Sequence, residues 1–316
     1  MPTDVHRPLW SVMIPTYNCA RYLRETLKSV MAQDPGPDRM QIEVVDDHST
    51  LDDPEVVVAE WAGRVAFVRQ PENVGHTENF STCLRRARGE LIHLLHGDDV
   101  VLTGFYRQME RAFQQNGRIG AAFCRHIFID GEGRWKGISP LEQRATGELE
   151  NGLERLASEQ RVVTPSMVVK RDVYEALGGF DDRLICSEDW EMWVRVAAHY
   201  PVWYEIEPLA MYRMHDASNT GRHIRSGEDI TFTYRAIEMF IPYLPDSMAS
   251  RVGRAAKITY AHAALRMARQ VYAAGDAAAA GAQIRAALAC SRSWTVLAHV
   301  GRLLSWAVWR RLSGKR

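Results

Sequence analysis

Short apolar runs alternate with segments of helical periodicity over the first hundred residues of the chain. The expected strands are residues 11–15, 42–45, 65–68 and 91–95, and the expected helices are residues 20–33, 54–63 and 77–87. Strands that alternate with helices favour a sheet whose strands are mostly parallel. The pattern therefore predicts a Rossmann-like α/β domain.

The middle and the end of the chain carry different patterns. Between residues 120 and 215 the expected strands are residues 121–130, 166–170 and 202–206, and the expected helices are residues 171–177 and 189–199. After about Ser226 the strand signals disappear, and helices are expected at residues 255–273, 277–289 and 293–312. We therefore divide the chain into an α/β domain of residues 1–220 and an all-α C-terminal region of residues 221–316.

Polar side chains follow the ends of several expected strands. Thr16, Asp46 and Asp98 each come at or just after an apolar run. Because the carboxyl ends of parallel strands meet at one edge of a sheet, these side chains should converge on one rim. Ligands of open α/β sheets bind at this rim.

Each acidic pair at this rim has two interpretations. The pair Asp46-Asp47 suits acceptance of the imide N–H of a pyrimidine base, or it is an Asp-rich turn. The pair Asp98-Asp99 offers hard oxygen ligands for Mg²⁺ or Mn²⁺, which can bridge the phosphates of a nucleotide diphosphate. Its alternative is a solvated turn that caps the next helix.

Further candidates lie at residues 187–190 and 212–215. Asp189 stands in the first turn of an expected helix, where a carboxylate either complements the helix dipole or acts as a general base toward an acceptor hydroxyl. Arg213 is a candidate partner for phosphate. His215 is a metal ligand, a hydrogen-bond donor to phosphate, or a structural histidine.

Composition narrows the class of protein. The 39 basic and 39 acidic residues balance, so no overall field favours nucleic acid and no such partner is expected. The five cysteines are scattered without a CxxC pair, which argues against a disulfide framework and for reduced thiols in the cytoplasm. The N-terminal pattern is not that of a signal peptide, and no stretch approaches about twenty uncharged apolar residues.

Several segments, taken in order, resemble the family 2 glycosyltransferases of the kind that build bacterial cell-surface glycans. The matching segments, which cover about residues 10–218, are SVMIPTYN, QIEVVDDHST, ENVGHTENF, RGELIHLLHGDDVVL, TPSMVVKRDVYEALGGFDDRL, SEDWEMWVRVA and MYRMHDAS. The resemblance implies a GT-A fold and a metal-dependent, inverting transfer of a sugar. The implied donor is a nucleotide-diphosphate sugar, and the implied acceptor is a hydroxyl of a glycan or of a lipid-linked glycan in polysaccharide biosynthesis.

The resemblance also implies roles for individual residues. It assigns the nucleotide sugar to Pro15, Thr16, Tyr17, Asn18, Asp47 and Asp98, the divalent metal (Mg²⁺ or Mn²⁺) to Asp98 and Asp99, and the catalytic base to Asp189.

Two positions depart from the family pattern. Many relatives carry a further Asp where this chain has His96, so His215 is a candidate to complete the metal ligands. Many relatives also carry an Arg where this chain has Glu78 and Asn79, so contacts to the diphosphate must come partly from elsewhere.

Two other functions are compatible with this fold. A catalytically silent module would bind a nucleotide sugar or glycan without transfer, but the retained Asp98, Asp99 and Asp189 favour the enzyme. A nucleotidyltransferase would prefer a Gly-rich loop with Arg or Lys after the first strand, and PTYNCARYL has none.

The last expected helix, residues 293–312, is amphipathic. One face gathers the apolar residues Val296, Leu297, Val300, Leu304, Ala307 and Val308, while Trp306 and Trp309 fall on or near the polar side. Trp residues beside a basic chain end favour peripheral contact with an anionic membrane, at the inner face of the cytoplasmic membrane. The alternative is that the apolar face packs on neighbouring helices.

Overall fold

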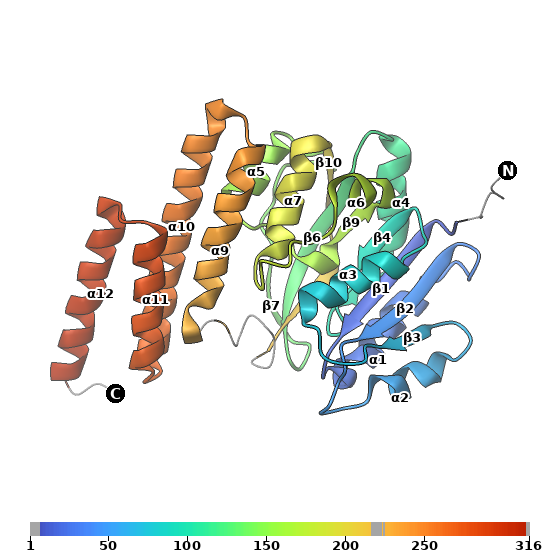
Figure 1. Ribbon diagram of the computed structural model, residues 1–316, viewed down its shortest axis with the longest axis horizontal. Helices are drawn as coiled ribbons and strands as arrows, with labels where there is room; N and C mark the ends of the chain where they lie inside the picture. Colours follow the sequence, from blue (N-terminus) through green and yellow to red (C-terminus); the bar gives the residue numbers. More distant parts are fainter. Residues whose placement is uncertain (1–6, 216–222, 224, 314–316) are drawn as a thin grey trace. The chain divides into compact units, whose positions relative to one another are not determined.

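The computed structural model describes residues 7–215, 223 and 225–313. These residues form two compact units, which are described separately (Figure 1). The first unit contains residues 7–152, 161–182 and 195–214, and the second contains residues 153–160 and 183–194 together with the described residues from 215 onward. The division at residue 220 stays a prediction, and two short segments before it belong to the second unit.

A single mixed sheet forms the centre of the first unit. Its strands are β1 (Trp10–Thr16), β2 (Met40–Asp46), β3 (Ala66–Arg69), β4 (Leu91–Leu94), β5 (Val100–Val101), β6 (Ala121–Asp130), β7 (Trp135–Ile138), β8 (Gly147–Glu148), β9 (Met167–Lys170) and β10 (Val202–Met214). Their order is β3-β2-β1-β4-β9-β6-β10-β5, with β7 beside β6 and β8 beside β10. β1 runs parallel to β2 and β4, β6 runs parallel to β10, and β9 is antiparallel to both β4 and β6. The mostly parallel α/β sheet is therefore confirmed.

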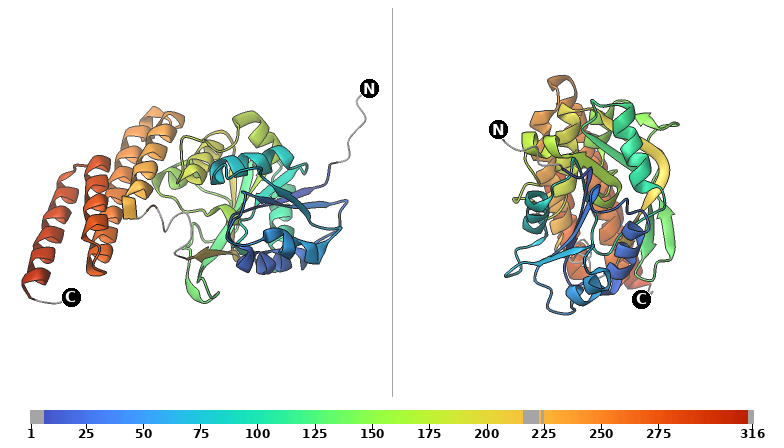
Figure 2. Two further views of the ribbon diagram at one scale, coloured as in Figure 1. Left: turned by 60° about the horizontal axis from the view of Figure 1, so that its bottom comes forward. Right: turned by 90° about the vertical axis from the view of Figure 1, so that its right-hand side faces the viewer.

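Helices cover both faces of this sheet. They are α1 (Ala20–Met31), α2 (Pro54–Val58), α3 (His76–Arg86), α4 (Phe105–Gln115) and α6 (Arg171–Leu177), with short 3₁₀ turns η1 (Ala59–Trp61) and η2 (Thr164–Ser166). α1 and α4 lie on one face and α3 on the other (Figure 2). Leu23, Leu27 and Val30 of α1 recur at helical spacing, and they share one buried core with Val12 and Ile42 of the sheet.

The second unit is helical. It contains most of α5 (Gly152–Ser158), the first half of α7 (Glu188–His199), and α9 (Glu228–Phe240), η3 (Ile241–Tyr243), α10 (Asp246–Ala273), α11 (Ala277–Cys290) and α12 (Trp294–Leu312). α10, α11 and α12 run side by side (Figure 1). Small side chains let these helices approach closely, since Ala264 and Ala268 share a core with Ala287. Asp276 and Ser293 cap the starts of α11 and α12 with side-chain hydrogen bonds.

Most expected elements are confirmed, and the exceptions have local causes. The helix expected at residues 54–63 tightens after Val58 into the 3₁₀ turn η1. The strand expected at residues 202–206 continues to Met214, because irregular pairing between Glu205 and Ala210 lets β10 bend and stay paired with β6. The short strands β5, β7 and β8 and the helix α5 were not predicted, since two to seven residues carry too little periodicity.

α12 orients differently from the expectation. Val296 and Leu303 are buried, whereas Leu304 is 52% exposed and Val308 is 58% exposed, so the predicted apolar face is split between core and surface. The pattern places Trp306 on or near the polar side, and there it is less exposed than Trp309. The ring of Trp306 is half-buried against Tyr272, with the ring centres 5.8 Å apart, because the side chain extends from its helix position toward α10.

Candidate active site

The ends of three neighbouring strands meet at one rim of the first unit, as the sequence predicts. The backbone N–H of Asp47, after β2, donates to Thr16 O of β1 at 2.9 Å. On the other side of β1, the N–H of Gly97, after β4, donates to Pro15 O at 3.0 Å. Pro15 and Thr16 thus lie between the two acidic segments.

The two carboxylates after β2 serve different partners. Asp46 is fully buried and accepts hydrogen bonds from Ser49 N and from Arg69 Nε, the latter at 2.7 Å, so it closes the turn and anchors β3. Asp47 faces the segment between β3 and α3. Its carboxylate accepts from Val74 N at 2.8 Å, and from Gly75 N and Asn73 Nδ2 at 3.0 Å each.

These donors leave Asp47 with unused acceptor capacity. A carboxylate has about four acceptor positions, and three protein N–H groups occupy three of them. Burial raises the pKa of Asp47, while the N–H groups of Val74 and Gly75 act in the opposite direction. The residue can therefore hold the 73–75 segment and still accept one further N–H from a ligand.

Of the residues after β1, Asn18 holds a neighbouring turn and Tyr17 is accessible at the rim. Asn18 has a positive φ of 51°, and its side-chain oxygen accepts from Thr50 N and Leu51 N at 2.9 Å each. Asn18 is therefore a clamp on the turn after β2. Tyr17 is 37% exposed, so its ring is accessible at the rim, where aromatic rings can stack on nucleobases.

The loop that carries Asp98 and Asp99 is fixed from two sides. Thr26 Oγ1 of α1 donates to Gly97 O at 3.1 Å and to Asp99 O at 2.8 Å. Arg213 of β10 donates through its backbone N to Asp99 Oδ1 at 2.8 Å and through Nε to Asp98 O at 2.8 Å.

Arg213 is therefore part of the scaffold. Its side chain is 2% exposed, pairs with Glu25 at 2.6 Å, and lies over the ring of Tyr22. The sequence suggested a phosphate partner at this position, but the guanidinium is already held by the loop and by Glu25.

Three potential metal ligands come together at this loop. Ligand atoms of His96, Asp98 and Asp99 all lie within 4.8 Å of one another. His96 Nδ1 is 3.2 Å from Asp99 Oδ2, and the His96 ring stacks on Phe80. Burial and the neighbouring Asp98 raise the pKa of Asp99, so a cation at this position would relieve the repulsion between the two carboxylates.

The donor set suits a divalent cation. Two carboxylates and one imidazole are acceptable ligands for Mn²⁺, and the carboxylates also suit Mg²⁺. The residue that departs from the family pattern, His96, is the one that joins the acidic pair. His215 opens the second unit, and its role as a ligand stays a prediction.

Asp189 lies at the start of α7, in the second unit. Its Oδ1 accepts from Gln160 Nε2 at 2.8 Å and from Trp190 N at 2.7 Å. Ser187, just before the helix, has a positive φ of 61°, and Glu191 N donates to Ser187 O at 3.1 Å. The carboxylate is half-buried and held in one orientation.

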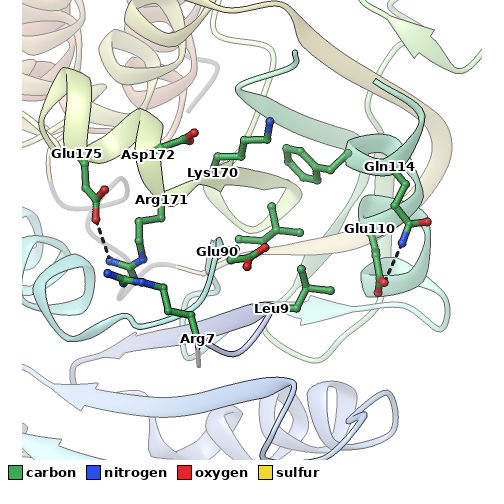
Figure 3. Close-up of a pocket in the computed structure, with 11 residues that line it drawn as sticks. Arg7, Leu9, Glu90, Glu110, Gln114, Lys170, Arg171, Asp172 and Glu175 are labelled. Atoms are coloured by element: carbon green, nitrogen blue, oxygen red, sulfur yellow. Dashed lines mark hydrogen bonds and ion pairs between the residues drawn. The ribbon is translucent and has the colours of Figure 1, made fainter. Parts of the chain in front are cut away.

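A pocket of about 470 Å³ lies at the opposite end of the strands (Figure 3). Arg7 and Leu9 precede β1, and Glu90 precedes β4. Lys170 is the last residue of β9, which runs the other way, and Arg171 follows it. Figure 3 shows acidic and basic side chains distributed around this pocket. None of the acidic pairs at the carboxyl-end rim lines it, so it does not form part of the candidate active site.

Comparison with known families identifies the family to which these strand ends and acidic residues belong. The model of a family described as Glycosyl transferase family 2 matches residues 11–178, more than half of the chain. The protein is a member of glycosyl transferase family 2. The match includes the strand ends of β1, β2 and β4 and the cluster of His96, Asp98 and Asp99.

Relatives of this glycosyltransferase include distant prokaryotic proteins. It is 28% identical over 223 residues to the uncharacterized glycosyltransferase MJ1057 of Methanocaldococcus jannaschii, covering 69% of this chain and 75% of that one. It is 24% identical over 207 residues to the O-antigen biosynthesis protein RfbC of Myxococcus xanthus, covering 60% of this chain and 16% of that one.

Solved structures show the same fold. Residues 1–349 of S. aureus TarS in complex with UDP-GlcNAc superpose with a TM-score of 0.67 at 15% identity, covering 90% of this chain and 91% of that one. A longer TarS chain is covered to 42%. The mannosyltransferase PcManGT from Pyrobaculum calidifontis, in complex with GDP-Man and Mn²⁺, superposes with a TM-score of 0.61 at 21% identity, covering 100% of this chain and 90% of that one. The fold of this family 2 glycosyltransferase is GT-A, followed by C-terminal helices.

Sequence reasoning gave no role to the residues that complete the rim. Asn73, Val74 and Gly75 supply donors to Asp47, although in the sequence their segment is recognisable only as part of the family pattern. An available signal was their position, because an Asn-x-Gly turn directly before a helix exposes backbone N–H groups. His96 is recognisable in the sequence only as a departure from the family pattern, because its place beside Asp99 depends on the folded loop.

Proposed function

We propose that the protein is an inverting glycosyltransferase that moves a sugar from a nucleotide-diphosphate donor to a hydroxyl of a glycan or of a lipid-linked acceptor. The observation that carries the proposal is the cluster of His96, Asp98 and Asp99 at the rim where the ends of β1, β2 and β4 meet, in a chain of family 2. Pro15, Thr16, Tyr17, Asn18, Asp47 and Asp98 line or shape the donor site in this proposal.

The donor site is assigned by the chemistry of its groups. Tyr17 offers a ring for the nucleobase, and Asp47 retains room to accept an N–H from the edge of the base. Known relatives differ in the base they bind, since the TarS structure holds UDP-GlcNAc and the PcManGT structure holds GDP-Man. Both classes of donor therefore belong in the first assay.

A divalent cation, Mg²⁺ or Mn²⁺, would be held by Asp98, Asp99 and His96, with His215 as a further candidate ligand. When bound, such a cation neutralises the charge that develops on the diphosphate as the sugar–phosphate bond breaks. Asp98 and Asp99 are fixed for this role by Thr26 and Arg213, which hold the loop through its carbonyl groups and through the Asp99 carboxylate.

Asp189 is the base in this proposal. Its carboxylate takes the proton of the acceptor hydroxyl, the acceptor oxygen forms a bond to the anomeric carbon, and the bond from that carbon to the diphosphate oxygen breaks. The nucleoside diphosphate leaves with the bonding electron pair, and the attack from the opposite side inverts the anomeric configuration.

The test is Asp189→Asn, a nearly isosteric change. Transfer should fall by about 10²–10⁴-fold, the usual contribution of a positioned base, while donor affinity stays within twofold. Asp172→Asn is the matched control, because Asp172 also lies in the first turn of a helix, α6. Unchanged transfer by Asp189→Asn would move the base to Glu188 or Asp181. Donor binding by the wild type without transfer to any acceptor would favour the silent module.

α12 favours an acceptor at a membrane. Six large apolar side chains of α12 are exposed, among them Trp294 at 79% and Leu312 at 83%. Residues 294–312 contain no Asp or Glu and include Arg302, Arg310 and Arg311. No helix in the described part of the chain is both long enough and apolar enough to span a membrane. We therefore propose that α12 lies on an anionic leaflet, at the cytoplasmic face, with a lipid-linked acceptor.

Liposome sedimentation tests this surface. The full chain should bind vesicles rich in phosphatidylglycerol and not vesicles of phosphatidylcholine alone. The double variant Leu304→Glu, Val308→Glu should lose this binding, whereas Leu51→Glu, which changes an even more exposed leucine of the first unit, should retain it. A wild-type dimer that the double variant dissociates, without vesicle binding, would assign the surface to a second copy and overturn the membrane proposal.

A further inference from the structure

The side chain of Gln160 and the backbone of Trp190 both donate to the carboxylate of Asp189. Gln160 Nε2 lies 2.8 Å from Oδ1, and the backbone N of Trp190 lies 2.7 Å from the same oxygen. The Trp190 donor is local, because its backbone N–H belongs to the residue directly after Asp189. Gln160 comes from a separate segment, twenty-nine residues earlier in the chain, so its position depends on how the second unit packs.

Gln160 is itself held by α10. The backbone N–H of Gln160 donates to Tyr260 Oη at 2.9 Å. The ring of Tyr260 packs against the ring of Trp190, with their centres 5.0 Å apart. Trp190 is anchored in turn, because its Nε1 donates to Leu156 O at 2.6 Å. Tyr260, Gln160 and the start of α7 therefore form one connected set of contacts.

The helix α9 and the turn η3 hold the same end of α7. Ser187 Oγ is 3.0 Å from Thr233 Oγ1 of α9, which supports the positive φ of Ser187. Tyr243 Oη donates to Glu191 Oε1 at 3.0 Å. The ring of Phe240 contacts that of Trp190, with centres 5.0 Å apart. The C-terminal helices thus hold the segment that carries Asp189 at several points.

We infer that Gln160 is a positioning residue for the catalytic base, and that Tyr260 of α10 positions Gln160. The inference rests on the proposed role of Asp189. The amide of Gln160 donates to the ionised carboxylate and fixes the direction of its oxygens, because a hydrogen bond to a charged acceptor is short and directional. A general base works only when its oxygen lies within hydrogen-bond reach of the acceptor hydroxyl. The C-terminal helices therefore contribute to catalysis as well as to the fold.

Two measurements test this inference. The first compares kcat with the donor KM in single variants, and the second combines each variant with Asp189→Asn in a double-mutant cycle. In Gln160→Met the side chain keeps its length and loses its donor, and kcat should fall about 10- to 100-fold. Tyr260→Phe removes only the hydroxyl that accepts from Gln160 N, and kcat should fall about three- to tenfold. The donor KM should stay within twofold for both variants. In the background of Asp189→Asn, neither substitution should lower the residual rate further, because each acts through the carboxylate.

Matched controls remove the effect of substitution itself. Gln114→Met breaks another amide–carboxylate pair, to Glu110 of α4, and Tyr272→Phe removes another hydroxyl from α10. Both should have the wild-type kcat. A wild-type kcat for Gln160→Met, in a protein whose Asp189→Asn variant has lost transfer, would overturn the positioning role and leave the base in place. A further loss by Gln160→Met on top of Asp189→Asn would also overturn it. Full transfer by Asp189→Asn itself would instead contradict the proposed function.

Discussion

A methyl group added at Gly97 would push the loop of Asp98 and Asp99 away from the end of β1. Gly97 stands between β4 and Asp98, and a Cβ built on it would lie 2.8 Å from Thr16 Oγ1, 3.0 Å from Cys19 Sγ and 3.1 Å from Thr16 Cβ. Thr16 and Cys19 are both buried and hydrogen-bonded to each other at 2.7 Å, so neither can move away at low cost. Only glycine allows the loop of Asp98 and Asp99 to approach β1 this closely.

Overpacking of a well-packed site costs about 1–3 kcal/mol, and contacts near or below 3.0 Å place Gly97→Ala within that range. The free energy of unfolding, measured by urea denaturation, should fall by this amount. Mn²⁺ and nucleotide affinity, measured by calorimetry on the folded variant, should also fall, because the loop moves away from β1.

Gly117→Ala is the matched control. A Cβ at Gly117 meets nothing within 4 Å, and its stability and both affinities should equal those of the wild type. If Gly97→Ala behaves like Gly117→Ala in all three measurements, the close approach of the loop of Asp98 and Asp99 to β1 does not shape the site. The role given to Gly97 would then be refuted.

Three further predictions concern the same unit. Asp47→Ala should weaken donor binding by about 1–3 kcal/mol in calorimetry, because the edge of the base loses the acceptor proposed for it and residues 73–75 lose the carboxylate that holds them. Unaltered affinity would limit Asp47 to the turn. Asp99→Asn should abolish Mn²⁺ binding at pH 7.5 in calorimetry while circular dichroism stays that of the wild type, and retained binding would remove Asp99 from the ligands. Burial lowers the pKa of His93 and of His126 to about 4. Below pH 6.5 the unfolded chain therefore binds more protons than the folded protein, and the free energy of unfolding should fall by about 2 kcal/mol per histidine between pH 7 and pH 5. A free energy of unfolding that is flat over this range would contradict the neutral state of these histidines.

The rim of the site could be predicted from sequence because it depends on local pattern. Thr16, Asp47 and Asp98 follow apolar runs, and parallel strands bring such positions together whatever the rest of the fold does. Gly97 and His96 could not be given their roles in this way. The first depends on a distance across two strands, and the second depends on the turn that brings its ring toward Asp99.

The partners of single polar residues were the least predictable part. In the sequence, Arg213 is a candidate phosphate ligand. In the structure its guanidinium donates to the carboxylate of Glu25 and to the carbonyl of Asp98, two residues that are distant along the chain. Gln160 gave no signal at all, because an isolated Gln in a loop matches no motif. Its contact with Asp189 exists only once the helical unit has formed.

The most direct test of the account is the release of nucleoside diphosphate from a panel of UDP- and GDP-sugars, measured with Mn²⁺ and with excess chelator. We expect release from at least one donor in the presence of a lipid-linked or glycan acceptor. Release should be lost with excess chelator and in the double variant Asp98→Asn, Asp99→Asn. Full release in excess chelator, or by the double variant, would contradict the metal role of the cluster, and no release from any donor would contradict the transferase itself.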